Sequence, residues 1–233
     1  MVQPKKEARA PWAGRETDPE RTKRARAVLR LLRKEYPGAK TALVHRSPFE
    51  LLVATVLSAQ STDRTVNEIT PGLFAKYSGP RAFLASAPGE LEQDIHRSGF
   101  FNQKAKSIRG LCRGLLDEFD GEVPRTMAEL TRLPGVARKT ANVVLSNAFG
   151  INDGIAVDTH VHRLSWRLAL SDADDPVKVE RDLMAMFPRA RWADVTHVLI
   201  EHGRAVCGAR APRCEDCVVN AKCPSSRAPG AAV

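Results

Sequence analysis

The sequence predicts an all-α protein whose helices are joined by short connections. Apolar residues recur at helical spacing in most segments, and no stretch shows the sustained polar and apolar alternation of a strand. The chain has 233 residues, enough to bury a sizeable core in one large domain or two small ones. We find no internal repeat and no low-complexity segment.

The expected helices have recognisable starts and ends. Asp18 and Pro19 open the first helix, which ends at Tyr36 before a proline and a glycine. Ser47 precedes the second helix, which is apolar nearly all round as far as Leu57 and should therefore be central and buried. In chain order, helices are expected at 18–36, 48–57, 63–77, 80–86, 89–97, 103–119, 127–132, 136–149, 159–169, 176–187 and 191–206.

Two turns in the first half of the chain carry conspicuous side chains. The segment 58–63 is polar although it directly follows a buried helix, and it contains Gln60. The segment 98–102 places two aromatic rings, Phe100 and Phe101, in one turn. We expect one ring to pack inward and the other to remain exposed. Asn102 should cap the helix that follows.

The stretch from Leu133 to Leu145 has the pattern of the second half of a helix-hairpin-helix. Thr126 and Glu129 have the spacing of a capping box, so a short helix should begin beside them. Proline and glycine then end this helix, and a second helix begins just past the glycine. Its free amides form a site for a phosphate oxygen, lined by Gly135, Val136, Ala137 and Arg138 and flanked by Lys139. The alternative is a plain helix corner with a solvated lysine.

A carboxylate and a cysteine group follow the hairpin. Asp158 and His160 stand near the start of the next apolar helix. Near the end, six, two and five residues separate successive members of a group of four cysteines: Cys207, Cys214, Cys217 and Cys223. Four thiolates suit either zinc or an iron-sulfur cluster, and spacing alone leaves both open. Cys112 lies in an expected helix and should be a small core residue.

Charge indicates the class of partner. The net charge of +9 makes a polyanion the expected partner, with nucleic acid the first candidate. Arginines at or near the cysteine group could hold phosphate or merely solvate a loop: Arg204, Arg210 and Arg213. Residues 1–17 should form a disordered basic tail and 225–233 a second tail. No apolar run reaches about 18 residues, so we expect no membrane association and a cytoplasmic protein, nucleoid-associated if bacterial.

The hairpin with Lys139, the segment from Val157 to His160 and the four spaced cysteines together resemble the endonuclease III family of helix-hairpin-helix DNA glycosylases. The resemblance covers about 18–224. It implies two helical domains with DNA lying across the cleft between them. One is a six-helix barrel that contains the hairpin, at 41–151. The other is an iron-sulfur cluster domain formed by both chain ends, at 18–40 and 152–224.

The resemblance also implies roles for individual residues. Lys139 would be the amine nucleophile, Asp158 the catalytic carboxylate and the four cysteines the ligands of a 4Fe-4S cluster. Gln60 matches the residue that fills the gap left by a flipped base. Phe100 stands where the family has a wedge leucine, and Ala137 stands in place of a second hairpin glycine. A helix N-terminus and partial burial would favour the neutral amine that Lys139 needs for attack.

The implied activity is that of a DNA glycosylase and abasic-site lyase of base excision repair. It would act as a monomer on double-stranded DNA containing oxidised pyrimidines or abasic sites. Adenine and other mismatch glycosylases are an alternative, although the adenine enzymes lack the lysine and carry a further C-terminal domain, whereas ten residues follow Cys223 here. A non-enzymatic helix-hairpin-helix module that only grips phosphate is a second alternative.

Overall fold

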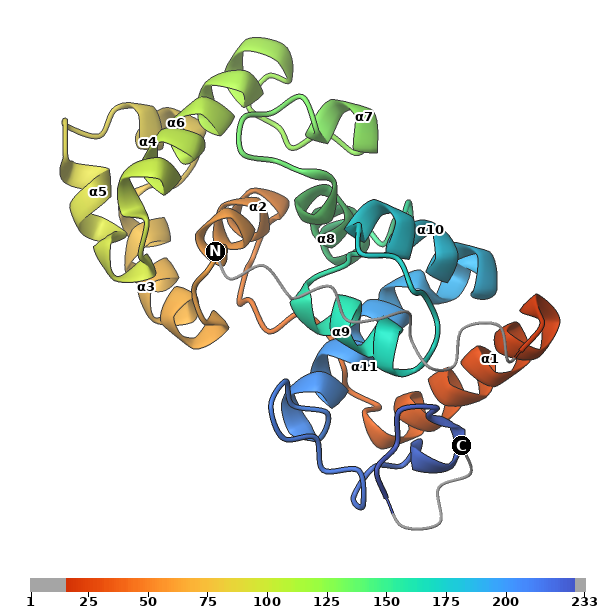
Figure 1. Cartoon of the computed structure of the whole chain (residues 1–233). Coiled ribbons are helices and arrows are strands. Elements are labelled where there is room, and N and C mark those ends of the chain that lie inside the picture. Colours follow the sequence, from red (N-terminus) through yellow and green to blue (C-terminus); the bar gives the residue numbers. More distant parts are fainter. Residues whose placement is uncertain (1–15, 229–233) are drawn as a thin grey trace. The chain divides into compact units, whose positions relative to one another are not determined.

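The computed structural model describes residues 16–228, and the predicted all-α class is confirmed because these residues contain helices and no strand (Figure 1). Most of the predicted basic tail, and the last five residues of the C-terminal tail, lie outside the described residues. In chain order the helices are α1 (Asp18–Glu35), α2 (Pro48–Leu57), α3 (Asp63–Lys76), α4 (Pro80–Leu84), α5 (Glu90–Asp94), η1 (His96–Ser98), α6 (Phe101–Glu118), α7 (Met127–Leu130), α8 (Arg138–Ala148), α9 (Thr159–Arg167), α10 (Pro176–Met186), η2 (Arg189–Arg191), α11 (Trp192–Ala205) and η3 (Asn220–Lys222).

The chain divides into two compact units. Residues from Thr41 to Asp153 form one, which we call the internal unit. The described residues up to Lys40 and from Gly154 onward form the other, which we call the terminal unit. No helix in residues 16–228 is both long and apolar enough to cross a membrane.

Helix α2 is the centre of the internal unit. Every residue of this helix from Leu51 to Leu57 is buried, as its all-round apolar sequence predicts. It packs against α3, α6 and α8, which surround it in Figure 1. Ser47 caps its start by accepting a hydrogen bond from the Glu50 amide at 3.2 Å. The predicted core role of Cys112 is also confirmed, since this side chain is fully buried in α6.

Two predicted helix starts are wrong. Asn102 does not cap α6, because it lies inside the first turn and the N-cap is Phe100 in the left-handed conformation. Helix α8 begins at Arg138 rather than at Val136, which is buried in the hairpin turn. The start of α6 lies two residues earlier than predicted, and its first residue, Phe101, packs against the core. The start of α8 lies two residues later than predicted, and Val136 before it is buried.

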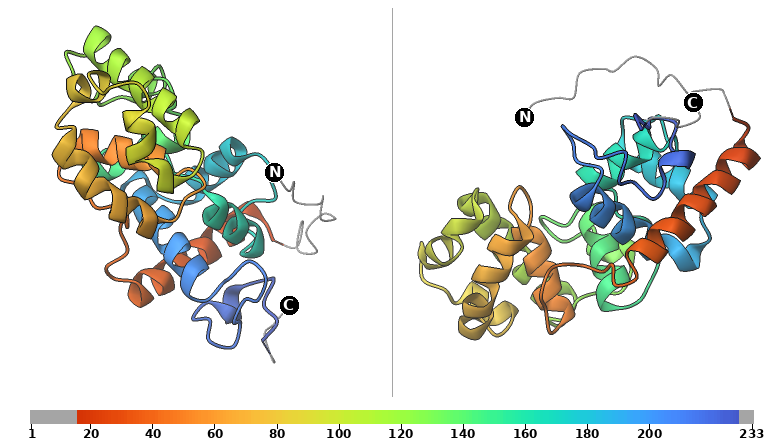
Figure 2. Two further views of the ribbon diagram at one scale, coloured as in Figure 1. Left: turned by 90° about the vertical axis from the view of Figure 1, so that its left-hand side faces the viewer. Right: turned by 90° about the horizontal axis from the view of Figure 1, so that it is seen from below.

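The terminal unit is built from both ends of the described chain. Helix α1 lies beside α11 and α10, and α9 packs on α11 (Figure 2). The apolar faces of these helices close one core that includes Leu32, Leu164, Leu183 and Leu199. The loop after α11 carries the four cysteines and packs against the same core.

Candidate functional site

The hairpin in the internal unit has the predicted order of a short helix, a glycine turn and a second helix. Thr126 accepts a hydrogen bond from the Glu129 amide at 3.2 Å and its hydroxyl donates to the Glu129 carboxylate at 2.6 Å, which starts α7. Gly135 then takes φ of +80°, a backbone conformation that favours glycine. Ala137 is the N-cap of α8 with φ of −87°, so no glycine is required at that position. The turn therefore presents the N-terminus of α8, where a phosphate oxygen can bind.

Helix α6 supports this turn through small residues that we had not singled out. A Cβ atom on Gly110 would lie 3.0 Å from Pro134 Cβ, and one on Gly114 would lie 2.9 Å from a Leu133 methyl. A Cβ on Gly135 itself would lie 2.8 Å from Ser107 Cβ. Glycine inside a helix destabilises it by about 1 kcal/mol relative to alanine. The close approach of the hairpin explains why α6 nevertheless contains Gly110 and Gly114. Their spacing of four residues was the signal available in the sequence.

Lys139 is the second residue of α8, and its side chain is exposed. The partial burial that we expected for it is therefore wrong for the free chain. Helix α8 has no acidic residue in its first turn, so no carboxylate there offsets the positive end of the helix dipole. Lys139 thus lies at the N-terminal end of α8 and is open to solvent.

Asp158 lies in the terminal unit and caps α9. Its Oδ1 atom accepts hydrogen bonds from the amides of His160 and Val161, each at 2.8 Å. Because both bonds end on Oδ1, the cap leaves Oδ2 available for another contact. His160 packs on α11, and its Nδ1 lies 3.2 Å from the Arg163 guanidinium. A Cβ on Gly203 would lie 2.9 Å from His160 Nδ1, so this glycine makes room for the ring.

Gln60 and Phe100 share an uncommon backbone conformation. Their φ angles are +53° and +48°, in the left-handed region that non-glycine residues rarely adopt. Both are exposed, and Phe100 leaves 67% of its surface open to solvent. Phe101, by contrast, is partly buried against the core and its ring lies 4.5 Å from that of His96. The expected division between one inward and one exposed ring is confirmed.

The four cysteines of the terminal unit line one cavity of about 70 Å³. No group of three or more histidine, cysteine, aspartate or glutamate side chains in residues 16–228 could hold a single metal ion. Burial raises the pKa of the Cys223 thiol to about 11 and also raises the pKa of Cys217. Proximity of the other cysteines adds to both shifts. A cationic centre in the cavity would reverse them, because it favours thiolates.

Hydrogen-bond donors hold the cysteine loop against α9 and α11. The Arg167 guanidinium donates to Cys207 Sγ at 3.2 Å and to the Gly208 carbonyl at 2.8 Å. Burial lowers the pKa of His202 to about 4, so its ring is neutral near pH 7. The Tyr36 hydroxyl lies 3.0 Å from His202 Nδ1, and Cys217 Sγ lies 3.3 Å from His202 Nε2. A Cys217 thiolate would accept from Nε2–H, with Tyr36 donating to Nδ1. Cationic and N–H donors of this kind stabilise thiolate charge.

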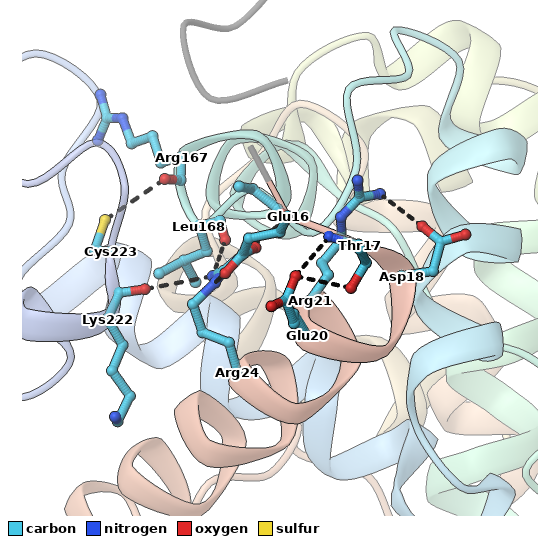
Figure 3. Close-up of polar contacts among 11 residues, drawn as sticks. Glu16, Thr17, Asp18, Glu20, Arg21, Arg24, Arg167, Leu168, Lys222 and Cys223 are labelled. Atoms are coloured by element: carbon cyan, nitrogen blue, oxygen red, sulfur yellow. Dashed lines mark hydrogen bonds and ion pairs between the residues drawn. The ribbon is translucent and has the colours of Figure 1, made fainter. Parts of the chain in front are cut away.

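Arg24 of α1 ties the N-terminal helix to the same loop (Figure 3). Its guanidinium donates to the carbonyl of Leu168 at 2.6 Å and to that of Lys222 at 3.3 Å, directly before Cys223. The Glu16 carboxylate pairs with it at 2.7 Å. The start of α1 is thus fastened to both the end of α9 and the last turn of the cysteine loop.

The three arginines predicted near the cysteine group differ in their contacts. Arg213 pairs with Asp216 at 3.1 Å and donates to the Ala205 carbonyl at 2.5 Å, so it shapes the loop. Arg204 lies 3.7 Å from the Glu201 carboxylate. Arg210 is exposed at the tip of the loop. Phosphate binding by Arg210 stays a prediction.

Comparison with known proteins identifies the family. Residues 53–189 match the model of the HhH-GPD superfamily base excision DNA repair protein. An endonuclease III from Synechocystis sp. is 53% identical over 88% of this chain and 94% of its own length. The chain belongs to the endonuclease III family. Two solved endonuclease III structures, a non-covalent DNA complex and a trapped DNA covalent intermediate, each match with a TM-score of 0.85 and 47% identity, over 88% of this chain and 96% of theirs.

Proposed function

We propose that this member of the endonuclease III family is a bifunctional DNA glycosylase and abasic-site lyase that removes oxidised pyrimidines. The observation that carries the proposal is an exposed lysine, Lys139, at the phosphate-binding end of the hairpin helix. A trapped covalent DNA intermediate of a relative with 47% identity supports it, because covalent capture requires a nucleophile on the enzyme.

Base removal would begin with extrusion of the damaged nucleotide, because its glycosidic bond is out of reach inside the duplex. Gln60 and Phe100 would fill the space it leaves. The neutral Lys139 amine then attacks C1′, and the C1′–N bond breaks with its electron pair going to the base. The leaving base takes up the proton that Nζ loses. The Nζ electron pair then forms the C=N bond, the C1′–O4′ bond breaks, and O4′ takes up a proton from water, which gives a protonated imine between Nζ and C1′.

Strand cleavage follows from the same imine. Loss of the C2′ proton sends an electron pair into a C2′–C3′ double bond, and the C3′–O bond breaks to release the phosphate. Asp158 would stabilise the cationic character of the sugar during base loss, as carboxylates do in sugar hydrolysis generally. The cap geometry supports this role, because it fixes one carboxylate oxygen and leaves the other available.

We propose that Cys207, Cys214, Cys217 and Cys223 hold a 4Fe-4S cluster. The four cysteines line one cavity, and four thiolates are the usual ligands of such a cluster. A cluster accepts more widely separated thiolates, because several iron and sulfide ions lie between them. The cluster would join the cysteine loop to α9 and α11 and would take no part in the proposed reaction steps.

Functional domains follow from these roles. Residues 41–151 would form the helix-hairpin-helix barrel that probes DNA, and 18–40 with 152–224 would form the cluster domain. The net charge of +9 opposes self-association and suits a monomer that acts on DNA in the cytoplasm, on the nucleoid in a bacterium.

Borohydride trapping on DNA with an abasic site tests the lysine mechanism. Reduction of the imine should leave wild-type protein covalently attached to the DNA, and Lys139→Ala should give no such product. Lys106→Ala is a matched control, because Lys106 is another exposed lysine of the internal unit. Undiminished trapping by Lys139→Ala would exclude Lys139. Base release without any trapping in the wild type would favour a glycosylase that uses water, and neither activity would favour a binding module.

A further inference from the structure

Lys104 is the one buried lysine or arginine among residues 16–228. It lies in the first turn of α6 with 5% of its surface exposed. Its Nζ atom donates to the Leu57 carbonyl at 2.8 Å and to the Ser98 carbonyl at 2.7 Å. Burial of an amine costs several kcal/mol unless hydrogen bonds compensate. The two hydrogen bonds to carbonyl oxygens therefore explain how the Lys104 amine can be buried.

The two carbonyls belong to the ends of two different elements. Leu57 is the last residue of α2, three residues before Gln60. Ser98 is the last residue of η1, two residues before Phe100. Carbonyls at helix ends lack the next turn's amides, so they are free to accept from a donor such as Lys104.

Lys104 also fixes the Phe100 turn through its backbone. Its amide donates to the Phe100 carbonyl at 3.0 Å, while its side chain holds the carbonyl of Ser98. Burial lowers the pKa of Lys104, but a neutral amine still has two hydrogens for its two acceptors. The connection between the two turns is therefore independent of the charge on the amine.

We propose that Lys104 is a positioning residue for DNA recognition, which joins the turn of Gln60 to the turn of Phe100 and sets the separation at which both side chains meet the duplex. The inference rests on the proposed function, in which those side chains fill the extruded nucleotide's place. A left-handed residue costs about 1–3 kcal/mol and persists only when its surroundings hold it. Lys104 provides a common anchor for two such residues, Gln60 and Phe100.

The test measures preference for a lesion rather than affinity alone. Full-length chain binds either a duplex with a tetrahydrofuran abasic analogue or the same duplex undamaged, and the ratio of the two affinities is recorded. Lys104→Met, which keeps the apolar stem, should lower this ratio about tenfold, the size of one lost stacking contact. Lys106→Met removes the same charge from the exposed side of α6 and should leave the ratio unchanged.

A second background separates positioning from general damage to the fold. In a Gln60→Ala/Phe100→Ala protein, Lys104→Met should change the ratio by less than about twofold, because the groups it positions are gone. An equal loss in both backgrounds, or no loss in either, overturns the inference. If Lys104→Met does not fold, Lys104→Gln replaces the amine with a shorter amide that reaches at most one of the two carbonyls, and it is judged by the same criterion.

Failure of the proposed DNA-filling roles can be distinguished from failure of the proposed role of Lys104. If the wild type has no preference for the analogue, or Gln60→Ala/Phe100→Ala keeps the wild-type preference, the DNA-filling roles are wrong and the inference falls with them. If both of those results are as proposed and Lys104→Met keeps the wild-type ratio, the role of Lys104 alone is wrong.

Discussion

Asp158 combines a structural and a proposed chemical role in one side chain. The same carboxylate caps α9 through Oδ1 and would stabilise the cationic sugar. A simple alanine substitution would remove both roles together. Asparagine separates them, because it is as good an N-cap as aspartate but carries no charge.

We predict that Asp158→Asn unfolds with a free energy within about 0.5 kcal/mol of wild type yet removes damaged bases at least about 100-fold more slowly. Asp158→Ala should lose the same activity and should also lower the free energy of unfolding by about 1 kcal/mol, because it removes the cap. Asp175 is a matched control, because its Oδ1 caps α10 by accepting from two amides at 3.0 Å. Asp175→Asn should leave base removal unchanged. Equal losses of activity at both caps would mean that Asp158 is only a cap.

Phe100 and Phe101 should respond oppositely to truncation. Phe100→Ala should weaken binding to lesion DNA roughly ten- to a hundredfold with little change in melting temperature, because the ring is 67% exposed and in the proposed role would stack only on DNA. Phe101→Ala should destabilise the fold by about 2–4 kcal/mol, since its ring packs against the core. Calorimetry and fluorescence anisotropy measure the two effects. A strong fall in melting temperature for Phe100→Ala would assign that ring to the core.

At the level of elements, the hairpin depends on α6 as much as on its own two helices. The turn rests on Ser107, Gly110 and Gly114, which are the small residues of one face of α6. This face brings Pro134 and Gly135 close enough that added Cβ atoms would collide. Two effects therefore restrict Gly135: its left-handed backbone and its contact with Ser107.

Gly135→Ala should lower the free energy of unfolding by about 2–4 kcal/mol, the sum of left-handed strain and overpacking. Gly150 isolates the first effect, because its φ is +66° and a Cβ there would meet nothing within 4 Å. Gly150→Ala should therefore cost only about 1 kcal/mol. Urea unfolding of the two variants gives the difference. Equal costs would show that the turn can move away from α6.

At the scale of the whole molecule, net charge determines how DNA binding responds to salt, and proton uptake determines how stability responds to pH. The net charge of +9 makes DNA binding weaker as salt rises. Stability has its own dependence on pH, in which His197 of α11 takes part. Burial lowers the pKa of His197 below its usual 6.5, and Asp194 opposes this shift only in part.

The free energy of unfolding should fall as the pH drops below 6.5, because the unfolded state then binds a proton on His197 that the native state resists. His197→Gln should reduce this slope by at most about 1.4 kcal/mol per pH unit, the value for one proton. Urea unfolding from pH 7 to pH 5 measures the slope. A His197→Gln slope identical to wild type would exclude this histidine.

Rules that act over a few neighbouring residues predicted most of the helices correctly. Helical periodicity and capping residues such as Ser47 and Thr126 predicted the helices, because these signals act within a few residues. The predicted starts of α6 and α8 were wrong, because Phe101 and Val136 take their places by packing against the core.

The sequence by itself determined the helical class, the hairpin and the family, since each depends on residue types at fixed spacing. Only the tertiary structure showed that Lys104 joins two turns 40 residues apart and that Arg24 reaches the loop before Cys223. It also showed that Lys139 is exposed rather than partly buried. Such features depend on which distant segments pack together, and burial and long-range hydrogen bonds leave no periodic trace in a single sequence.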